Sequence, residues 1–379
     1  MKHHRKRLFP LAFLLLFLLP GCGAPARQDP KTISGELRYE NSLSLQYAEH
    51  FTADYYEGGY TLLTIAGQDR VLLIPEGKEV PSDLPEDVRT IQMPLERVCL
   101  VNSGAMDYYL SLGAAEQLRF TATKKDGWYL SGAKDLMERG ELLYAGKYSA
   151  PDYEMLKSQQ CDLAIENTMI FHTPEVKEQL ERLNIPVIVD YSSYESTPQG
   201  KVEWIKFYGE LTGRRKLAEK LFQQQAALFE KMDGENATGK TVVYFYITSG
   251  GEVRVRRASD SVPKMIELAG GKYAFPDLGA GESKVSSTVT LQMEAFYAVA
   301  KEADFLIYNS TIDGELKNLS SLLEKEPLLG NCKAVKNGSV FCTTKNLYQA
   351  SMSLGTFTED LRKMLTGERD SLQFLYPLE

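Results

Sequence analysis

The chain has 379 residues, of which 43% are hydrophobic and 25% are charged, with 43 Lys and Arg against 51 Asp and Glu. This composition is typical of a globular protein and excludes an intrinsically disordered chain. The net charge of −8 argues against nucleic acid as a partner, because proteins that bind nucleic acid present a basic surface.

The first 21 residues have the form of a secretion signal. A basic start, which includes Lys2 and Arg5, precedes an apolar run from Leu8 to Leu19. That run has about 12 residues, well short of the about 20 that a bilayer span needs. It leads into Leu19-Pro20-Gly21-Cys22, the pattern of a lipobox. The sequence therefore predicts cleavage before Cys22 and lipidation of that cysteine. The alternative is an uncleaved membrane anchor, although no stop-transfer charges follow.

Cleavage leaves about 358 residues with 39 basic and 51 acidic side chains, a net charge of −12. This length suits two domains of ordinary size. We expect residues 22–40 to form a lipid-proximal tether, 41–195 an N-terminal α/β lobe, 196–236 a helical connector and 237–379 a C-terminal α/β lobe.

Short apolar runs alternate with amphipathic stretches in both halves, which predicts α/β layers with largely parallel sheets. In the first half we expect a hairpin of strands 61–66 and 70–74, followed by strands at 98–102, 142–144, 163–165 and 187–190. In the second half we expect strands at 242–247 and 305–308, and a hairpin from Cys332 to Cys342 with its turn at Asn337-Gly338. A disulfide across that hairpin is left open by the sequence.

The segment between the halves is the most helical part of the chain. Thr197 is a typical helix N-cap and Pro198 suits a first turn, and apolar residues then recur at helical spacing up to Gly213. The stretch from Arg214 to Met232 predicts a second helix of about 19 residues and about 28 Å. We therefore expect two Rossmann-like α/β lobes joined by a long rigid helix, with a ligand cleft between the lobes.

Ligands of open α/β sheets bind at the carboxyl ends of the strands, where the loops converge. In the first half this rule, together with a basic and aromatic loop, selects Asn102, Ser103, Met106, Lys125, Trp128, Tyr148, Glu166, Asn167 and Tyr191. In the second half it selects Arg254, Arg256, Arg257, Asn309, Ser310, Lys345 and Tyr348.

The arginines are the most informative of these residues. Arg254 and Arg256 alternate on one face of an expected strand, so both could project into the cleft. Guanidinium groups suit catecholate or carboxylate oxygens because they donate two hydrogen bonds at once. The alternative is a solvated edge strand whose charges discourage pairing.

Each half also carries one Glu near a helix start, at a similar interval before a strand. These are Glu154, ahead of the strand at 163–165, and Glu294, ahead of the strand at 305–308. Acidic residues at helix N-termini are stabilised by the helix dipole, which is the ordinary explanation for both.

The order of these features resembles substrate-binding proteins of ABC importers for iron-siderophore, haem and cobalamin, which are class III periplasmic binding proteins. The lipobox, the two α/β halves and the segments Glu195–Lys206 and Val262–Gly271 carry the resemblance, which extends from about Leu62 to Phe374. It implies a monomer that holds a ferric siderophore or haem between its lobes, with a corrinoid as the alternative ligand, and no resident cofactor. It also implies that Glu154 and Glu294 dock on arginines of an ABC permease.

Other functional classes find less support in the sequence. Proteins that bind bare zinc or manganese commonly use three His, and only His50 and His172 remain after cleavage. The chain has no G-x-S-x-G elbow, no phosphate loop and no H-E-x-x-H motif, so we do not expect an enzyme. A structural or adhesion lipoprotein remains an alternative.

Overall fold

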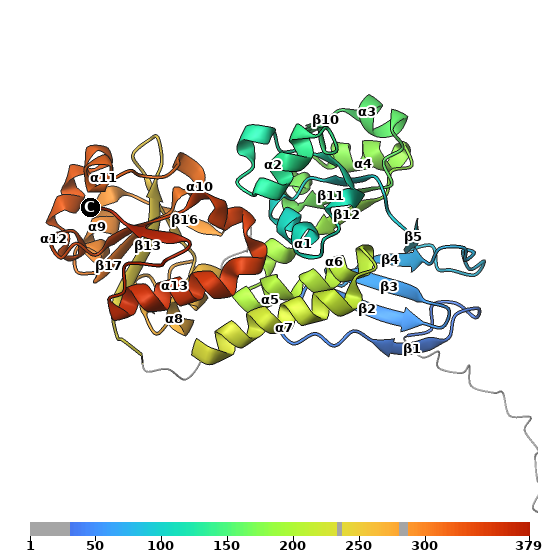
Figure 1. Cartoon of the computed structure of the whole chain (residues 1–379), viewed down its shortest axis with the longest axis horizontal. Coiled ribbons are helices and arrows are strands. Elements are labelled where there is room, and N and C mark those ends of the chain that lie inside the picture. The colour runs from blue at the N-terminus through green and yellow to red at the C-terminus, as the bar shows by residue number, and fades with distance from the viewer. Residues whose placement is uncertain (1–30, 233–236, 280–286) are drawn as a thin grey trace, which may run out of the picture.

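The structure, a computed structural model, describes residues 31–232, 237–279 and 287–379. Cys22 and its predicted lipidation therefore lie outside the described residues. Across these ranges no helix combines the length and the hydropathy that a membrane span requires. The fold is mixed α/β, and its three larger sheets are arranged around a group of helices in the middle of the chain (Figure 1).

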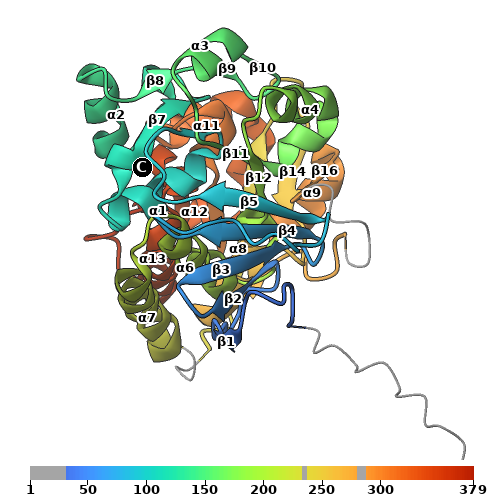
Figure 2. The same cartoon turned by 90° about the vertical axis from the view of Figure 1, so that its right-hand side faces the viewer.

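The first sheet is mainly antiparallel and lies at one end of the molecule (Figure 2). Its strands, in spatial order, are β1 (Tyr39–Ser42), β2 (Phe51–Tyr56), β3 (Tyr60–Ile65), β4 (Asp69–Ile74) and β5 (Val88–Gln92). The pairing of β3 with β4 confirms the predicted hairpin. Only this hairpin was expected, so the sequence did not reveal a separate sheet within residues 41–195.

The packed structure begins earlier than we predicted. Ile33 and Leu37 are buried in one apolar cluster with Leu72 and Ile74 of β4, and β1 pairs with β2. The tether expected over residues 22–40 is therefore wrong for its last ten residues, because two apolar side chains there complete a face of the sheet.

The second sheet is fully parallel, with the order β12-β11-β6-β7-β8. Its strands are β6 (Val98–Leu100), β7 (Leu118–Thr121), β8 (Leu143–Tyr144), β11 (Leu163–Asn167) and β12 (Val187–Asp190). Helices α1 (Met106–Ser111), α2 (Ser131–Glu138), α3 (Tyr153–Ser158) and α4 (Pro174–Arg182) and the small pair β9 (Gly146–Lys147) and β10 (Ala150–Pro151) connect them. The predicted strands are confirmed. We missed β7, because Arg119 interrupts its short apolar run.

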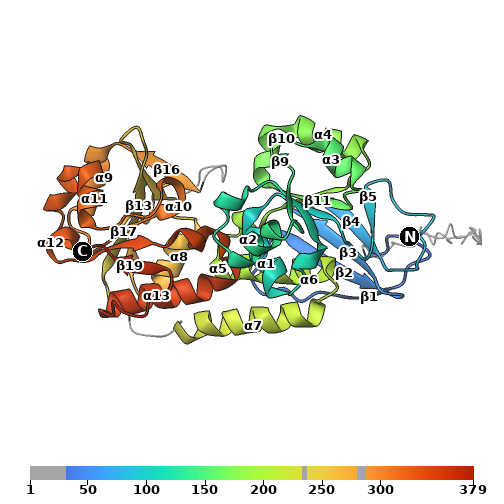
Figure 3. The same ribbon diagram turned by 45° about the horizontal axis from the view of Figure 1, so that its top comes forward.

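Three consecutive helices follow, α5 (Pro198–Glu203), α6 (Ile205–Leu211) and α7 (Arg215–Met232). Thr197 caps α5 as predicted, since its hydroxyl accepts the Gly200 N–H at 3.0 Å. The predicted long helix also matches α7 closely. Figure 3 shows α7 along one side of the molecule, and it packs against α6 and α13 (Leu354–Thr366).

The third sheet belongs to the second half of the chain (Figure 1, yellow to red). Its strands are β13 (Thr241–Ile247), β14 (Val253–Arg256), β15 (Lys272–Tyr273), β16 (Thr288–Leu291), β17 (Phe305–Tyr308), β18 (Val340–Thr343) and β19 (Leu375–Pro377). Its other helices are α8 (Ser261–Leu268), α9 (Met293–Ala300), α10 (Ser310–Asp313), α11 (Leu319–Lys325) and α12 (Lys333–Lys336). Strands β13, β15, β17 and β18 run parallel, whereas β14, β16 and β19 are antiparallel to their neighbours.

The predicted hairpin from Cys332 to Cys342 is wrong. Cys332 precedes α12, whereas Cys342 lies in β18, and both thiols are free and buried. Gly338 has a φ of +63° and follows the C-cap of the helix. The Asn-Gly pair therefore ends a helix instead of turning a hairpin, because both structures place a glycine in the left-handed region.

Candidate functional site

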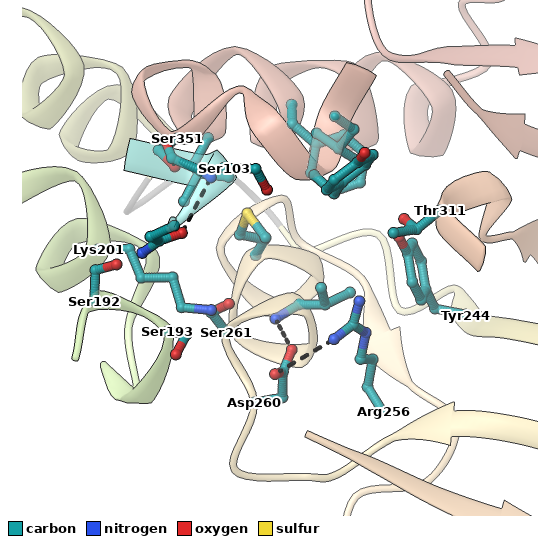
Figure 4. A pocket seen from close by; sticks show the side chains of 18 of the residues that line it. Ser103, Ser192, Ser193, Lys201, Tyr244, Arg256, Asp260, Ser261, Thr311 and Ser351 are labelled. Atoms are coloured by element: carbon teal, nitrogen blue, oxygen red, sulfur yellow. Dashed lines mark hydrogen bonds and ion pairs between the residues drawn. The ribbon is translucent and has the colours of Figure 1, made fainter. Parts of the chain in front are cut away.

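A pocket of about 260 Å³ lies between residues of the two halves of the chain (Figure 4). Its first wall comes from the segment that follows β6, which includes Asn102 and Ser103, and from Lys201 of α5. Its second wall comes from β13, β14 and the start of α8. The pocket is completed by Ser192, Ser193 and Thr311 and by residues between Leu347 and Phe357. The pocket is therefore formed by strand ends and helix starts that are far apart in sequence.

Arg256 and Asp260 form the charged part of the second wall. The Arg256 guanidinium lies 3.7 Å from the Asp260 carboxylate and 5.7 Å from the centre of the Tyr244 ring. Asp260 is also the N-cap of α8, where it accepts the Val262 N–H at 3.0 Å. The Arg256 charge is thus compensated within the protein and held in one place.

Lys201 supplies the other positive charge of the pocket, and its side chain extends into it (Figure 4). Burial lowers the pKa of the Lys201 ammonium group, while the nearby negative charge of Asp260 opposes that shift. No hydrogen bond or ion pair joins this ammonium group to another of the described residues. It is therefore a partly buried cation whose charge is not directly compensated.

Aromatic side chains fix the backbone that carries Lys201. The Tyr108 hydroxyl donates to the Lys201 carbonyl oxygen at 2.6 Å, and the Tyr108 ring stacks on Tyr208 at 4.8 Å between ring centres. The Tyr208 hydroxyl donates in turn to the buried carboxylate of Asp190. Burial raises the pKa values of Tyr108, Tyr208 and Asp190, and the two phenol groups hold the wall in place as neutral hydrogen-bond donors.

A second cavity of about 680 Å³ adjoins the first and shares Asn102, Ser193 and Asp260 with it. Its lining includes Arg257 and a partly apolar surface around Phe171, whose side chain is 51% exposed. Other residues of this surface are Met169, His172 and Tyr194. Together the two cavities offer a region with cationic side chains and a partly apolar surface.

The structure brings six of the predicted ligand residues to these cavities. Asn102, Ser103, Arg256 and Tyr348 line the first, and Asn102, Asn167 and Arg257 line the second. Arg254 and Arg256 do share a face of β14, as predicted from their alternation. Arg254 nevertheless lines neither cavity, because it lies two residues before Arg256 and therefore closer to the turn between β13 and β14.

Five other predicted residues are buried, namely Met106, Trp128, Glu166, Asn309 and Ser310. Met106 and Trp128 belong to a hydrophobic core. Asn309 caps α10 by accepting the Thr311 N–H at 3.1 Å, and Ser310 bonds to Thr343 at 3.0 Å. These polar groups follow strands, as expected, but they stabilise the loops and do not line the cavities.

The remaining predicted residues lie outside both cavities, namely Lys125, Tyr148, Tyr191, Arg254 and Lys345. Lys125 pairs with Glu138 at 2.8 Å. Lys345 lies 5.1 Å from the centre of the Tyr129 ring. Tyr191 packs against two residues that line the second cavity, with ring centres 6.0 Å from Phe171 and 5.7 Å from Tyr194.

The segment 345–353 joins the two halves beside the first pocket. The Gln349 side chain accepts the Tyr129 N–H at 2.8 Å and donates to the Gly127 carbonyl at 2.9 Å. The Met352 N–H donates to the Asp107 carboxylate at 2.7 Å. These bonds cross between parts of the chain more than 200 residues apart, so they fix one side of the pocket.

Sequence reasoning missed several lining residues, above all Lys201, Asp260 and Ser261. Lys201 looked like an ordinary polar residue of a helix, and no local pattern marks it as facing a cavity. Asp260 did carry a signal, because Asp-Ser-Val-Pro is typical of a helix start. That signal would have placed the α8 N-terminus after β14, although not opposite Lys201.

Glu166 lies on the opposite face of β11 from Asn167, and burial raises its pKa from 4.5 to about 8. Between pH 4.5 and about pH 8 the Glu166 carboxyl group therefore keeps its proton in the folded chain and loses it in the unfolded chain. Its contribution to stability is complete below pH 4.5 and is lost as the pH rises to about 8. We expect Glu166→Gln to remove this dependence, at about 1.4 kcal/mol per pH unit, and to be the more stable form at pH 9. Urea unfolding of both forms at pH 5 and pH 9 measures it, and equal pH dependence would contradict the assignment.

Comparisons with known proteins support the fold. No protein-family model matches the chain. Two uncharacterized lipoproteins of Methanocaldococcus jannaschii are similar to it: one is 26% identical, covering 88% of this chain and 87% of the relative, and the other is 23% identical, covering 85% and 79%.

Solved structures with a similar fold are periplasmic binding proteins. A periplasmic haem-binding protein of Vibrio cholerae aligns with a TM-score of 0.56 at 19% identity, covering 71% of this chain and 98% of its own. An ABC-type Fe³⁺-hydroxamate transport protein of Saccharomonospora viridis aligns with a TM-score of 0.52 at 18% identity, covering 77% and 97%. The chain thus has the mixed α/β fold of periplasmic binding proteins, and about a quarter of it lies outside the part that these structures share.

Proposed function

We propose that this protein is an extracytoplasmic substrate-binding lipoprotein of an ABC importer, which captures an iron chelate, a ferric siderophore or haem, and delivers it to a permease. The observation that carries the proposal is the pair of adjoining cavities lined by both halves of the chain. The fold shared with periplasmic binding proteins supports it, as does the lipobox that ends at Cys22.

In this proposal residues 41–195 and 237–379 act as two lobes, and the connector 196–236 with its helix α7 keeps them at a fixed distance. The crossing hydrogen bonds of Gln349 and Met352 support this arrangement, because they would have to break if the lobes moved apart. A ligand would therefore enter between lobes that move little.

The cavities also favour an anionic, partly aromatic ligand. Lys201 and Arg257 supply positive charge, whereas the charge of Arg256 is compensated by Asp260, and the apolar surface at Phe171 offers a contact for a ring system. Haem and ferric catecholates combine these two properties. A corrinoid remains the alternative ligand.

The visible absorption spectrum of the protein purified from its native host tests the proposal. Haem, ferric catecholates and corrinoids absorb differently, so a bound ligand would identify its own class. If the purified protein is colourless, titration with haemin, a ferric siderophore and cobalamin follows. Failure to bind any of the three would contradict the proposed ligand class.

Limited closure is a prediction of the proposed lobe arrangement. Helix α7 contains no glycine between Arg215 and Met232, and it packs against both α6 and α13. We expect small-angle scattering to give nearly the same radius of gyration for the free and the loaded protein. A clear contraction on loading would show that the lobes rotate about the connector.

A further inference from the structure

The uncompensated cation at Lys201 leads to an inference about the ligand that this pocket accepts. Among the described residues that line the pocket, the charged side chains are the two cations Lys201 and Arg256 and the anion Asp260. Arg256 is paired with Asp260 and also donates to Ser287 at 3.2 Å. The net charge of +1 is therefore carried by Lys201.

Leaving this ammonium group without a partner is unfavourable, because a cation removed from water requires a counter-charge or hydrogen-bond acceptors. The fold nevertheless fixes it in that position. Thr197 caps the helix that carries Lys201, and Tyr108 binds the Lys201 carbonyl oxygen. A cation fixed in a cavity between two parts of the chain is arranged to meet a charge from outside the protein.

The hydroxyl groups of Ser193 and Ser261 lie in the same lining. Neither forms a side-chain hydrogen bond with the other described residues, so both are available as donors to an anionic oxygen. The Asp260 carboxylate in the opposite wall would repel a second negative charge. This combination favours a singly charged group with two oxygens over a phosphate dianion.

We propose that the Lys201 ammonium group binds a free carboxylate of the transported ligand, with Ser193 and Ser261 donating to its oxygens. This inference rests on the proposed function only in treating the pocket as a ligand site. It restricts the ligand to chelates or cofactors that carry at least one free carboxylate, and it assigns the anion contact to Lys201 instead of the arginines of β14.

The test compares the wild type with Lys201→Met, which keeps the length of the side chain and removes its charge. Lys264→Met is the matched control, because Lys264 lies on α8, pairs with Glu267 at 3.1 Å and does not line the pocket. The probes are haemin, haemin dimethyl ester, ferric citrate and iron-free citrate, titrated by calorimetry into the mature protein.

We expect Lys201→Met to bind haemin or the citrate probes about ten- to a hundredfold more weakly than the wild type, the range for a hydrogen bond to a charged group. Lys264→Met should stay within about twofold of the wild type. If haemin binds, its dimethyl ester should bind the wild type as weakly as haemin binds Lys201→Met, since the ester has no free carboxylate.

Three results would overturn the inference. The first is equal affinity of the wild type and Lys201→Met for a carboxylate probe that binds, and the second is no binding of any carboxylate probe by the wild type. The third is equal binding of haemin and its dimethyl ester, which would leave the proposed capture of an iron chelate intact. Conversely, binding of iron-free citrate that depends on Lys201, with no binding of any of the three iron probes, would support the inference and contradict the proposed iron ligand. Should Lys201→Met fold poorly, Lys201→Gln takes its place in the same titrations.

Discussion

Replacing Glu203 by Ala is expected to lower the free energy of unfolding by about 3–5 kcal/mol, the cost of removing one partner from a buried ion pair. Glu203 is fully buried, and its carboxylate lies 3.0 Å from the Lys206 ammonium group, which is 4% exposed. It also accepts the backbone N–H groups of Gln46, Tyr47 and Ala48 at 2.7–3.0 Å. The substitution leaves the three backbone N–H groups without their acceptor and removes the only buried carboxylate of the pair, while Lys206 keeps the half-exposed Glu219 and the Ser44 carbonyl oxygen.

Glu219→Gln provides the matched control. Glu219 pairs with the same Lys206 ammonium group at 3.0 Å, but its side chain is 48% exposed. Exposed ion pairs contribute about 1 kcal/mol or less, so this variant should stay close to the wild type. The comparison of the two variants therefore separates the effect of burying the carboxylate from the effect of its pairing with Lys206.

Urea unfolding followed by tryptophan fluorescence measures both variants. The chain has two Trp, and both Trp128 and Trp204 are buried in the core that contains α6 and part of α7. The signal thus reports on the region that Glu203 stabilises. A loss for Glu203→Ala no larger than that for Glu219→Gln would show that the backbone contacts of residues 46–48 contribute little.

The second large effect concerns delivery of the ligand. Glu154 and Glu294 both lie in the first turns of exposed helices, α3 and α9, as the sequence predicted. Neither carboxylate has an ion pair or hydrogen bond with another described residue. Both are therefore available for arginines of a permease, which is the role that we propose for them.

We expect the double variant Glu154→Arg and Glu294→Arg to lower ligand uptake by cells at least tenfold, because each change sets like charges against each other at the permease. Ligand affinity of the purified protein should change less than twofold, since neither residue lines a cavity. Uptake by cells and calorimetric titration measure the two effects separately.

The control is the double variant Glu76→Arg and Glu368→Arg, which makes the same change in net charge at two other exposed positions. It should leave uptake close to the wild-type level. If the docking variant also keeps normal uptake at equal expression, Glu154 and Glu294 are ordinary acidic residues at helix starts. If it loses ligand affinity instead, the two residues contribute to the ligand site.

Features that depend on neighbours in sequence were predicted well. The cap at Thr197, the helix α7 and most strands of the parallel sheet follow from hydrophobic periodicity and turn residues, which act over a few positions. The same local signals failed at Asn337-Gly338, where a hairpin turn and a helix end require the same backbone conformation. Local pattern alone does not separate these two outcomes.

Tertiary structure alone decided which polar residues share a site. Lys201 meets Arg256 and Asp260 only because the start of α5 and the start of α8 come together from different halves of the chain. Likewise, Glu203 contacts residues 46–48 across about 155 positions of sequence. The sequence determined the elements and the strand ends at which a ligand site was to be sought. Packing of the sheets determined which side chains face the cavities, because a side chain on a helix or strand faces a cavity or the core according to the neighbour against which that element packs.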